Sequence, residues 1–260
     1  MKDMQNQPDG RQIDIDQVGI RDIVYPVTVK DRSKGSQSTV ATISMSVNLP
    51  HHFKGTHMSR FVEVLNKHRD NISTTSIREI LTDMQKSLNA DEAHLEMSFK
   101  YFIEKKAPVS GQSALMDYDC TFKSALCGDK KDLVMTIHVP VLALCPCSKE
   151  ISAYGAHNQR SIVSISVRTS SLVWIEELIE YAEGAASSPI YALLKREDEK
   201  YVTEKSYENP AFVEDIVRNA TEMLDKDERI IWFEVSSTNM ESIHNHNAWA
   251  VIRRDKRSMS

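Results

Sequence analysis

The apolar positions in the first half of the chain follow the period of a strand, then that of a helix, then that of a strand again. Alternating, β-branched stretches on either side of a short polar segment predict a β-hairpin. Apolar residues at helical spacing then predict two amphipathic helices, and two longer alternating stretches follow them. The predicted elements are strands at 22–30 and 39–48, helices from Ser59 and from about Thr75 to Leu88, and strands at 93–103 and 113–124.

The second half of the chain repeats this order, without obvious residue identity between the halves. The pair Asn209-Pro210 predicts a helix start, because asparagine caps free amides and the φ of proline suits the first turn. The predicted elements are strands at 133–142 and 160–168, helices at 173–183 and 210–224, and strands at 229–236 and 247–253.

These patterns predict an α+β fold made of two fused units, each with the order ββααββ. Side by side, the units would form one long antiparallel sheet with four helices on one face. Such a sheet leaves open edges, and the pairing of edges between subunits predicts an oligomer. The expected divisions are a flexible N-terminal arm at 1–15, a first half at 16–130, a second half at 131–254 and a charged tail at 255–260.

Composition excludes several classes of protein. With 260 residues and 41% hydrophobic content, the chain can bury a full core without disulfide bonds. A net charge of -5 argues against broad binding to nucleic acid or to anionic membranes, so any phosphate site must be local. No apolar run approaches the roughly 20 residues that span a bilayer, and the N-terminus lacks the apolar core of a secretion signal. We therefore expect a cytoplasmic protein with reduced thiols.

Reactive side chains are concentrated between residues 144 and 161. Cys145 and Cys147 lie there together with His157, two cations and a carboxylate. This density is hard to explain as core or as solvated surface, so it predicts a metal site or a thiolate nucleophile. Cys120 and Cys127 lie in the strand-like region before it and are interpreted as small packing residues.

Six short motifs occur in order along nearly the whole chain. They are GTHMSRF at 55–61, APVSG at 107–111, CPCSKEIS at 145–152, YGAHNQRS at 154–161, EKYVTEK at 199–205 and ESIHNH at 241–246. With these motifs the chain resembles the prokaryotic type IB GTP cyclohydrolase I family. The resemblance implies a tunnelling fold (T-fold), in which the subunits of a homotetramer close a barrel with active sites at their interfaces. It also implies that water opens the imidazole ring of GTP, formate leaves and ring closure gives 7,8-dihydroneopterin triphosphate.

The resemblance further implies one divalent metal ion per active site. The implied ligands are Cys145, His157, Glu199 and His244. One thiolate, two imidazoles and a carboxylate suit zinc, with manganese or iron as alternatives. Such an ion can activate water for attack on the guanine ring. The spacing of the four residues matches no compact metal motif, so without the resemblance a buried cysteine with satisfied polar neighbours is an equal alternative.

Two residues beside the implied ligands are candidates for catalysis. The resemblance gives Cys147 a direct part in the reaction, and a short helix starting near Ser148 would make its thiol more reactive. The alternative is that Cys147 is a second metal ligand. His246 is the candidate for proton transfer near neutral pH, and on an extended segment it would share one face with His244. The alternative is that His246 only orients its neighbour.

Substrate binding requires a group for the guanine edge and several for the triphosphate. The resemblance places Glu214 at guanine, where a carboxylate matches the N1–H and amino donors with paired hydrogen bonds. Without the family, Glu214 is an ordinary exposed acid at a helix start. The triphosphate candidates are His57, Arg60, Lys149 and Arg160, each of which alone is better explained as a solvated charge.

Two other functions compete with this interpretation. A nitrile reductase of deazaguanine synthesis would use a cysteine and a nicotinamide cofactor, but it needs no metal-ligand set. A non-catalytic oligomer that binds purine nucleotides would release no formate from GTP. The sequence leaves open which metal is used, which basic residues hold the triphosphate, and whether the product feeds folate or modified-tRNA synthesis.

Overall fold

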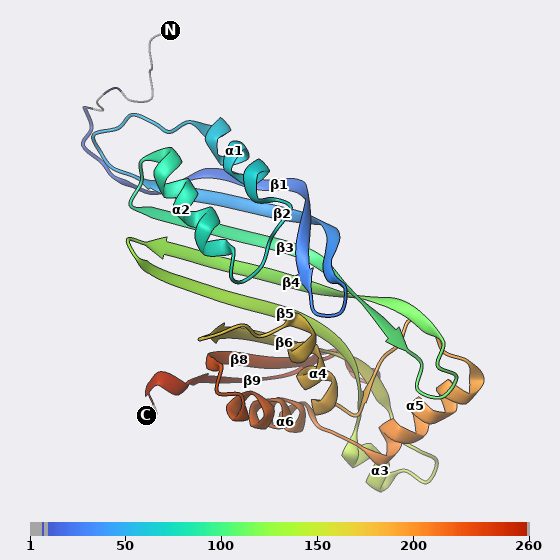
Figure 1. Cartoon of the computed structure of the whole chain (residues 1–260). Helices are drawn as coiled ribbons and strands as arrows, with labels where there is room; N and C mark the ends of the chain where they lie inside the picture. Colours follow the sequence, from blue (N-terminus) through green and yellow to red (C-terminus); the bar gives the residue numbers. More distant parts are fainter. Residues whose placement is uncertain (1–6, 8–9, 259–260) are drawn as a thin grey trace. The chain divides into compact units, whose positions relative to one another are not determined.

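The structure is a computed structural model that describes residue 7 and residues 10–258. It consists of two compact units. Figure 1 labels the helices and strands along the chain. Unit 1 contains the described residues up to Lys100 together with Thr121–Met135, and unit 2 contains Tyr101–Cys120 and the described residues from Thr136 onward. Residues 1–6 and 8–9 of the expected arm, and residues 259–260 of the expected tail, lie outside the described residues.

The strands of unit 1 begin with the predicted hairpin. In it, β1 (Ile15–Asp31) pairs antiparallel with β2 (Gly35–Leu49). The carboxylate of Asp31 holds the turn, because it accepts hydrogen bonds from the backbone N–H groups of Ser33 and Lys34, both at 2.8 Å. Gly35 closes the turn with a φ of 79°, a conformation that favours glycine. The predicted hairpin is confirmed, with strands longer than predicted.

Three further strands continue the order in unit 1, which is β1-β2-β3-β4-β5. They are β3 (Glu92–Lys106), β4 (Ser113–Cys127) and β5 (Lys130–Leu144). Ala41 of β2 lies opposite Phe99 of β3, so the two strands pair antiparallel. The boundaries between the units fall within these three strands, and each strand therefore contributes residues to both units.

Two helices lie on one face of the strands of unit 1 (Figure 1). They are α1 (Met58–His68) and α2 (Ile77–Leu88), and both predicted helices are confirmed. Helix α2 begins two residues after Thr75 because the preceding residues form a turn, in which the N–H of Ser73 donates to Oγ of Ser76 at 2.9 Å. Core residues of the unit include Val29, Ile43, Met45, Phe61, Leu65 and Leu81.

Unit 2 has the strand order β5-β6-β8-β9 beyond its share of β3 and β4. Helices α4 and α6 pack against each other, α4 against β6, and α6 against β8 and β9. The additional elements are β6 (Asn158–Thr169), α4 (Ile175–Ala185), β7 (Ser188–Pro189), which pairs with β5, α6 (Val213–Lys226), β8 (Ile230–Asn239) and β9 (Ala248–Asp255). The predicted α+β class and antiparallel strands are confirmed.

The predicted start of the last helix at Pro210 is wrong, because α6 begins at Val213. Asn209 ends a different helix, α5 (Arg196–Glu208), and its backbone N–H donates to the carbonyl of Lys205 at 3.1 Å. The asparagine therefore closes one helix instead of opening the next.

Helix α5 is missing from the sequence prediction. Only Asp198 and Ser206 of its residues are buried, so the helix has no apolar stripe for a periodicity argument to detect. A short helix, α3 (Pro146–Ile151), also forms in unit 2, close to where one was expected. The four helices of the prediction are present, and the second unit adds these two.

Charged residues near the C-terminus contact helix α6. Arg254 pairs with Asp225 at 2.7 Å. Nζ of Lys256 donates to the carbonyls of Asp225 and Asp227 at 2.9 and 2.8 Å. A cation at the end of a helix is favourable there, because the last carbonyl groups carry partial negative charge.

The cysteines are free, and their exposure differs from one to the next. Cys120 is buried as expected, but Cys127 is exposed, so its interpretation as a packing residue is wrong. It lies at the end of β4, where the alternation of buried and exposed positions places it outward.

Among the described residues, no helix is long and apolar enough to cross a membrane.

Candidate active site

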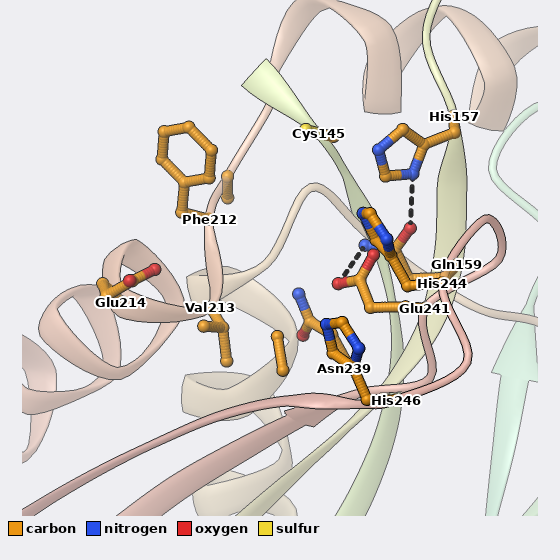
Figure 2. A pocket seen from close by; sticks show the side chains of 12 residues that line it. Cys145, His157, Gln159, Phe212, Val213, Glu214, Asn239, Glu241, His244 and His246 are labelled. Atoms are coloured by element: carbon orange, nitrogen blue, oxygen red, sulfur yellow. Dashed lines mark hydrogen bonds between the residues drawn. The ribbon is translucent and has the colours of Figure 1, made fainter. Parts of the chain in front are cut away.

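One pocket of about 290 Å³ in unit 2 is lined by several of the reactive side chains singled out in the sequence (Figure 2). It lies where the ends of β5 and β8 meet the starts of β6 and α6, beside the segment that follows β8. Five of the predicted site residues line it: Cys145, His157, Glu214, His244 and His246. Gln159, Asn239 and Glu241 add further polar groups.

Cys145 and His157 are held side by side by hydrogen bonds from three backbone N–H groups, two of which are accepted by side chains. The N–H of Cys145 donates to the carbonyl of His157 at 3.1 Å, and the N–H of His157 donates to Oγ of Ser148 at 3.0 Å. The N–H of Ser148 in turn donates to Sγ of Cys145 at 3.4 Å, so the thiol caps α3. The helix begins at Pro146, which suits a first helical position, and not at Ser148.

His157 also takes part in a chain of side chains on the same wall of the pocket. Its Nδ1 lies 3.0 Å from Oε1 of Gln159, and Nε2 of Gln159 lies 3.5 Å from Oε1 of Glu241 (Figure 2). Gln159 is buried, with 7% of its surface exposed. A buried amide is therefore in hydrogen-bond contact with the His157 ring.

His244 and His246 come from an irregular segment after β8. Their rings are stacked, with centroids 5.2 Å apart and planes at 18° to each other. The expectation of an extended segment is wrong, because residues 242–246 are bent. The expected result still holds, since both imidazoles line the same pocket.

Glu214 and Asp215 are neighbouring carboxylates at the start of α6 with different surroundings. Asp215 accepts the backbone N–H of Phe212 at 3.1 Å and so caps the helix. Glu214 is exposed and lines the pocket, on the side opposite the histidines (Figure 2). The helix cap is thus supplied by one acid, which leaves the other to face the pocket.

Asn239 forms part of the pocket lining at the end of β8 and is buried. Its Oδ1 lies 2.7 Å from Oγ of Ser161 and 3.5 Å from Oγ of Ser237. Hydroxyl donors on the oxygen side fix the amide orientation, so the Nδ2 group is the end that remains for the pocket.

Four predicted residues of unit 2 do not line this pocket. Cys147 is exposed as the second residue of α3, and Glu199 lies in the first turn of α5. Nζ of Lys149 donates to the carbonyl of Tyr207 at 2.6 Å. Arg160 is exposed on β6.

The two predicted phosphate ligands from the first half belong to unit 1. His57 occupies the position before α1, and Nη1 of Arg60 donates to the carbonyl of Ser87 at 2.7 Å. Their part in phosphate binding stays a prediction.

The predicted metal ligands only partly converge. Cys145, His157 and His244 line the pocket and Glu199 does not. Within residue 7 and residues 10–258, no group of three His, Cys, Asp or Glu side chains has the arrangement of a metal site. The ligand set therefore stays a prediction.

Close to Glu199, the carboxylate of Asp198 ties the start of α5 to the loop between β3 and β4. It accepts the N–H groups of Val109, Ser110 and Lys195 at 2.8, 2.9 and 2.8 Å, and the hydroxyl of Ser110 at 2.6 Å. Burial raises the pKa of Asp198, but these hydrogen bonds outweigh it and hold the pKa below its ordinary value.

Sequence reasoning assigned no role to Gln159, Asn239 or Glu241. Gln159 and Glu241 lie inside the quoted motifs at 154–161 and 241–246, which was the available signal. Their function depends on the hydrogen bonds that they form between β6, β8 and the neighbouring segments. The order of residues in the sequence does not show these contacts.

Comparison with known proteins extends over almost the whole chain. Residues 1–250 match a family model described as type I GTP cyclohydrolase folE2. The chain is 56% identical over 257 residues to a GTP cyclohydrolase FolE2 from Geotalea uraniireducens, covering 99% of this chain and 94% of that protein. It is 57% identical over 256 residues to a GTP cyclohydrolase FolE2 from Nitrosomonas eutropha, covering 98% of this chain and 96% of that protein.

Solved structures with a similar fold include urate oxidases. The uricase from Arthrobacter globiformis has a TM-score of 0.52 at 10% identity, covering 92% of this chain and 93% of that chain. The urate oxidase from Bacillus subtilis has a TM-score of 0.53 at 8% identity, covering 93% and 99%. At such identities the likeness shows the fold alone, which is the predicted tunnelling fold.

Proposed function

This chain belongs to the type I GTP cyclohydrolase folE2 family, and from this membership we propose how its residues divide the reaction between them. The protein is an enzyme with GTP cyclohydrolase I activity. Water opens the imidazole ring of guanine, formate leaves, and ring closure gives 7,8-dihydroneopterin triphosphate. Family membership sets aside the nitrile reductase and the non-catalytic oligomer. The observation that carries the assignment of residues is a single pocket with a thiol and three imidazoles facing the carboxylate of Glu214.

The family is metal-dependent, and the donor atoms of the pocket suit a divalent ion. Cys145, His157 and His244 offer one sulfur and two nitrogen ligands, a mixture that fits zinc and is compatible with iron or manganese. We propose that these three residues, with Glu199 from the adjacent helix α5, hold one ion per active site. Such an ion, when bound, supplies Lewis acidity that makes hydroxide available near neutral pH.

The guanine base is proposed to bind through Glu214. A carboxylate accepts two parallel hydrogen bonds from the N1–H and exocyclic amino group of guanine, which no adenine edge can donate. Glu214 lines the pocket, and the neighbouring Asp215 caps the helix. The base would then extend from Glu214 toward the imidazoles on the other side of the pocket.

Proton transfers are assigned to His246 and Cys147. An imidazole titrates near neutral pH and can pass protons to the ring nitrogens and the ribose oxygen. His246 lies in the pocket, stacked on the proposed ligand His244. Cys147 follows the proposed ligand Cys145 by two residues, in the first turn of α3. A cytoplasmic location is proposed as well, because this role needs a reduced thiol.

The proposed contacts of the triphosphate are the predicted basic residues Lys149, Arg160, His57 and Arg60. The Lys149 ammonium lies 4.4 Å from the centre of the Tyr207 ring and is held by the Tyr207 carbonyl. Binding to phosphate would require Lys149 to exchange this carbonyl for a phosphate oxygen, which is a stronger, charge-assisted acceptor.

A homotetramer that closes a barrel, with active sites at its subunit interfaces, is the proposed assembly. Strand β9 pairs with β8 and is the last strand of the order in unit 2. Trp249 on β9 has 60% of its surface exposed. An unpaired strand edge with an exposed aromatic residue is a natural surface for pairing with a second copy.

Metal removal and reconstitution test the proposal. The protein is stripped with a chelator, and zinc, manganese or iron(II) is then restored singly while formate and the fluorescent oxidised pterin are measured. We expect no formate release without metal and recovery with at least one ion, at one equivalent per chain. Full turnover by the stripped protein would refute the metal assignment. A His244→Ala variant that binds metal as the parent does would remove His244 from the ligand set.

A further inference from the structure

Gln159 connects a proposed metal ligand to a carboxylate that has no assigned role. Its Oε1 lies 3.0 Å from Nδ1 of His157, and its Nε2 lies 3.5 Å from Oε1 of Glu241. Its side chain is buried, and Figure 2 shows the three side chains in a row along one wall of the pocket. A buried amide between an imidazole and a carboxylate has few ways to satisfy its hydrogen bonds.

The carboxylate of Glu241 decides which way the hydrogen bonds run along the row formed by Glu241, Gln159 and His157. An ionised carboxylate only accepts hydrogen bonds, so the amide of Gln159 must turn its Nε2 group toward Glu241. Its Oε1 then faces His157 and can only accept, so Nδ1 of His157 must carry the proton. In a neutral imidazole the other nitrogen, Nε2, is then left with the lone pair.

We propose that Gln159 is a positioning residue that, together with Glu241, fixes the Nδ1–H tautomer of His157 and turns its Nε2 lone pair into the pocket. The consequence for metal affinity rests on the proposed function, in which His157 is a ligand. The tautomer itself does not depend on that assignment.

The backbone around His157 supports a positioning role for Gln159. The N–H and carbonyl of His157 are already held by Ser148 and Cys145, which leaves the ring torsions as the remaining freedom. Gln159 is the second residue of β6, and His157 is the residue just before that strand, so the amide reaches the ring from the start of β6. An amide in this place holds the ring without occupying the pocket. Partners of this kind behind a ligand typically contribute about 10- to 100-fold to metal affinity.

The tautomer can be read from nitrogen-15 chemical shifts of the histidine rings in metal-free protein at about pH 8, well above the ordinary imidazole pKa of about 6.5. A His157→Gln variant identifies the signals of His157. We expect protonated Nδ1 in the parent and a change to protonated Nε2 in Gln159→Leu. The matched control is Asn158→Leu, an exposed amide next along the strand, which should leave the tautomer unchanged. Protonated Nε2 in the parent, or protonated Nδ1 kept in Gln159→Leu, overturns the proposal.

A second variant keeps the test informative if Gln159→Leu does not fold. In Glu241→Gln the new amide can donate as well as accept, so the amide of Gln159 can take either orientation. We expect a mixture of both His157 tautomers in this variant. A pure Nδ1–H signal there would show that Glu241 does not set the direction.

Metal affinity separates this inference from the proposed function. In competition with a chromogenic chelator, Gln159→Leu should bind zinc about 10- to 100-fold more weakly, and Asn158→Leu should match the parent. A changed tautomer with unchanged affinity would support the positioning role and remove His157 from the ligand set. An unchanged tautomer would refute the positioning role whatever the affinity.

Discussion

Glu214 and Glu222 lie on the same helix but in different surroundings, which makes them a matched pair for testing recognition of guanine. Glu214 lines the pocket, and Glu222 is exposed further along α6. Replacing Glu214 by glutamine removes the charge and one acceptor, so a hydrogen bond worth about 1.5–3 kcal/mol is lost. We expect guanine nucleotides to bind roughly 10- to 100-fold more weakly to Glu214→Gln in calorimetric titrations, with metal content unchanged.

Glu222→Gln should bind guanine nucleotides as the parent does. Equal affinity of the Glu214→Gln variant and the parent would remove Glu214 from the base-binding role. A loss of metal in the same variant would instead place Glu214 among the ligands.

Cys147 and Cys127 are both exposed, and only Cys147 belongs to the reactive segment. Partial desolvation and the neighbouring Glu92 raise the pKa of the Cys127 thiol, which disfavours its reactive thiolate form. Cys147→Ala should retain GTP binding and lose formate release by about 10²- to 10⁴-fold, the usual contribution of a group that transfers protons. Cys127→Ala is the control and should turn over normally. Formate release at the parental rate by Cys147→Ala would exclude a catalytic role.

At the scale of residues, the sequence predicts the groups that carry chemistry and misses the groups that orient them. Cys145, His157 and His244 are recognisable because their side chains are reactive and stand in motifs. Gln159 has an ordinary amide, and its meaning depends on atoms of His157 and Glu241 that only folding brings within reach. A pattern of residue types contains no such distances.

At the scale of elements, Asp198 decides how the start of α5 is held. Asp198→Asn would replace one carboxylate oxygen by an amino group, which cannot accept the hydrogen bonds made there. At least one backbone N–H would lose its partner in a buried place, so we expect a lower melting temperature. Because the adjacent Glu199 is a proposed ligand, zinc affinity should fall in the same variant.

The effect of Asp198 on stability should depend on pH in a defined direction. Its pKa is lower in the folded than in the unfolded chain, so the native state binds fewer protons and stability rises with pH in this range. The contribution is complete above the unfolded pKa of about 3.9 and is lost as pH falls toward the lower folded value. The melting temperatures of parent and Asp198→Asn should therefore converge as the pH is lowered below about 4. A constant difference down to acidic pH would contradict this account.

Another test at this scale is the buried ion pair that joins β3 to α4. Lys105 and Glu183 pair with only 14% and 15% of their side chains exposed, and the hydroxyl of Tyr118 donates to Glu183 at 3.1 Å. Burial lowers the pKa of Lys105, while Glu183 opposes this effect. Lys105→Met leaves an unpaired buried carboxylate and should cost about 3–5 kcal/mol in denaturant unfolding.

The matched control is the exposed pair Lys200–Glu204 on α5, where the side chains are 74% and 60% exposed. Lys200→Met should change the free energy of unfolding by less than about 0.5 kcal/mol. Equal effects of the two substitutions would show that the burial of the Lys105–Glu183 pair has no energetic consequence.

At the scale of the whole molecule, the two ββααββ passages could be predicted because periods of two and 3.6 residues are visible without any contact. The insertion between α4 and α6 could not, since α5 buries almost nothing and β7 is two residues long. The boundary between the units was equally hidden, because it falls inside β3, β4 and β5, whose alternation continues across it. Periodicity identifies helices and strands that bury one face. It does not identify exposed helices such as α5 or very short strands such as β7.

Assembly offers the last prediction at this scale. If the active sites are shared between subunits, activity must depend on association, and sedimentation should give a particle of about four times the 29.6 kDa of one chain. Trp249→Ser removes an exposed aromatic residue from β9, so smaller species and a specific activity that falls on dilution are expected. Tyr201→Ser, on α5, is the control and should remain fully assembled. A monomer with full specific activity at every dilution would mean that each site is complete within one chain.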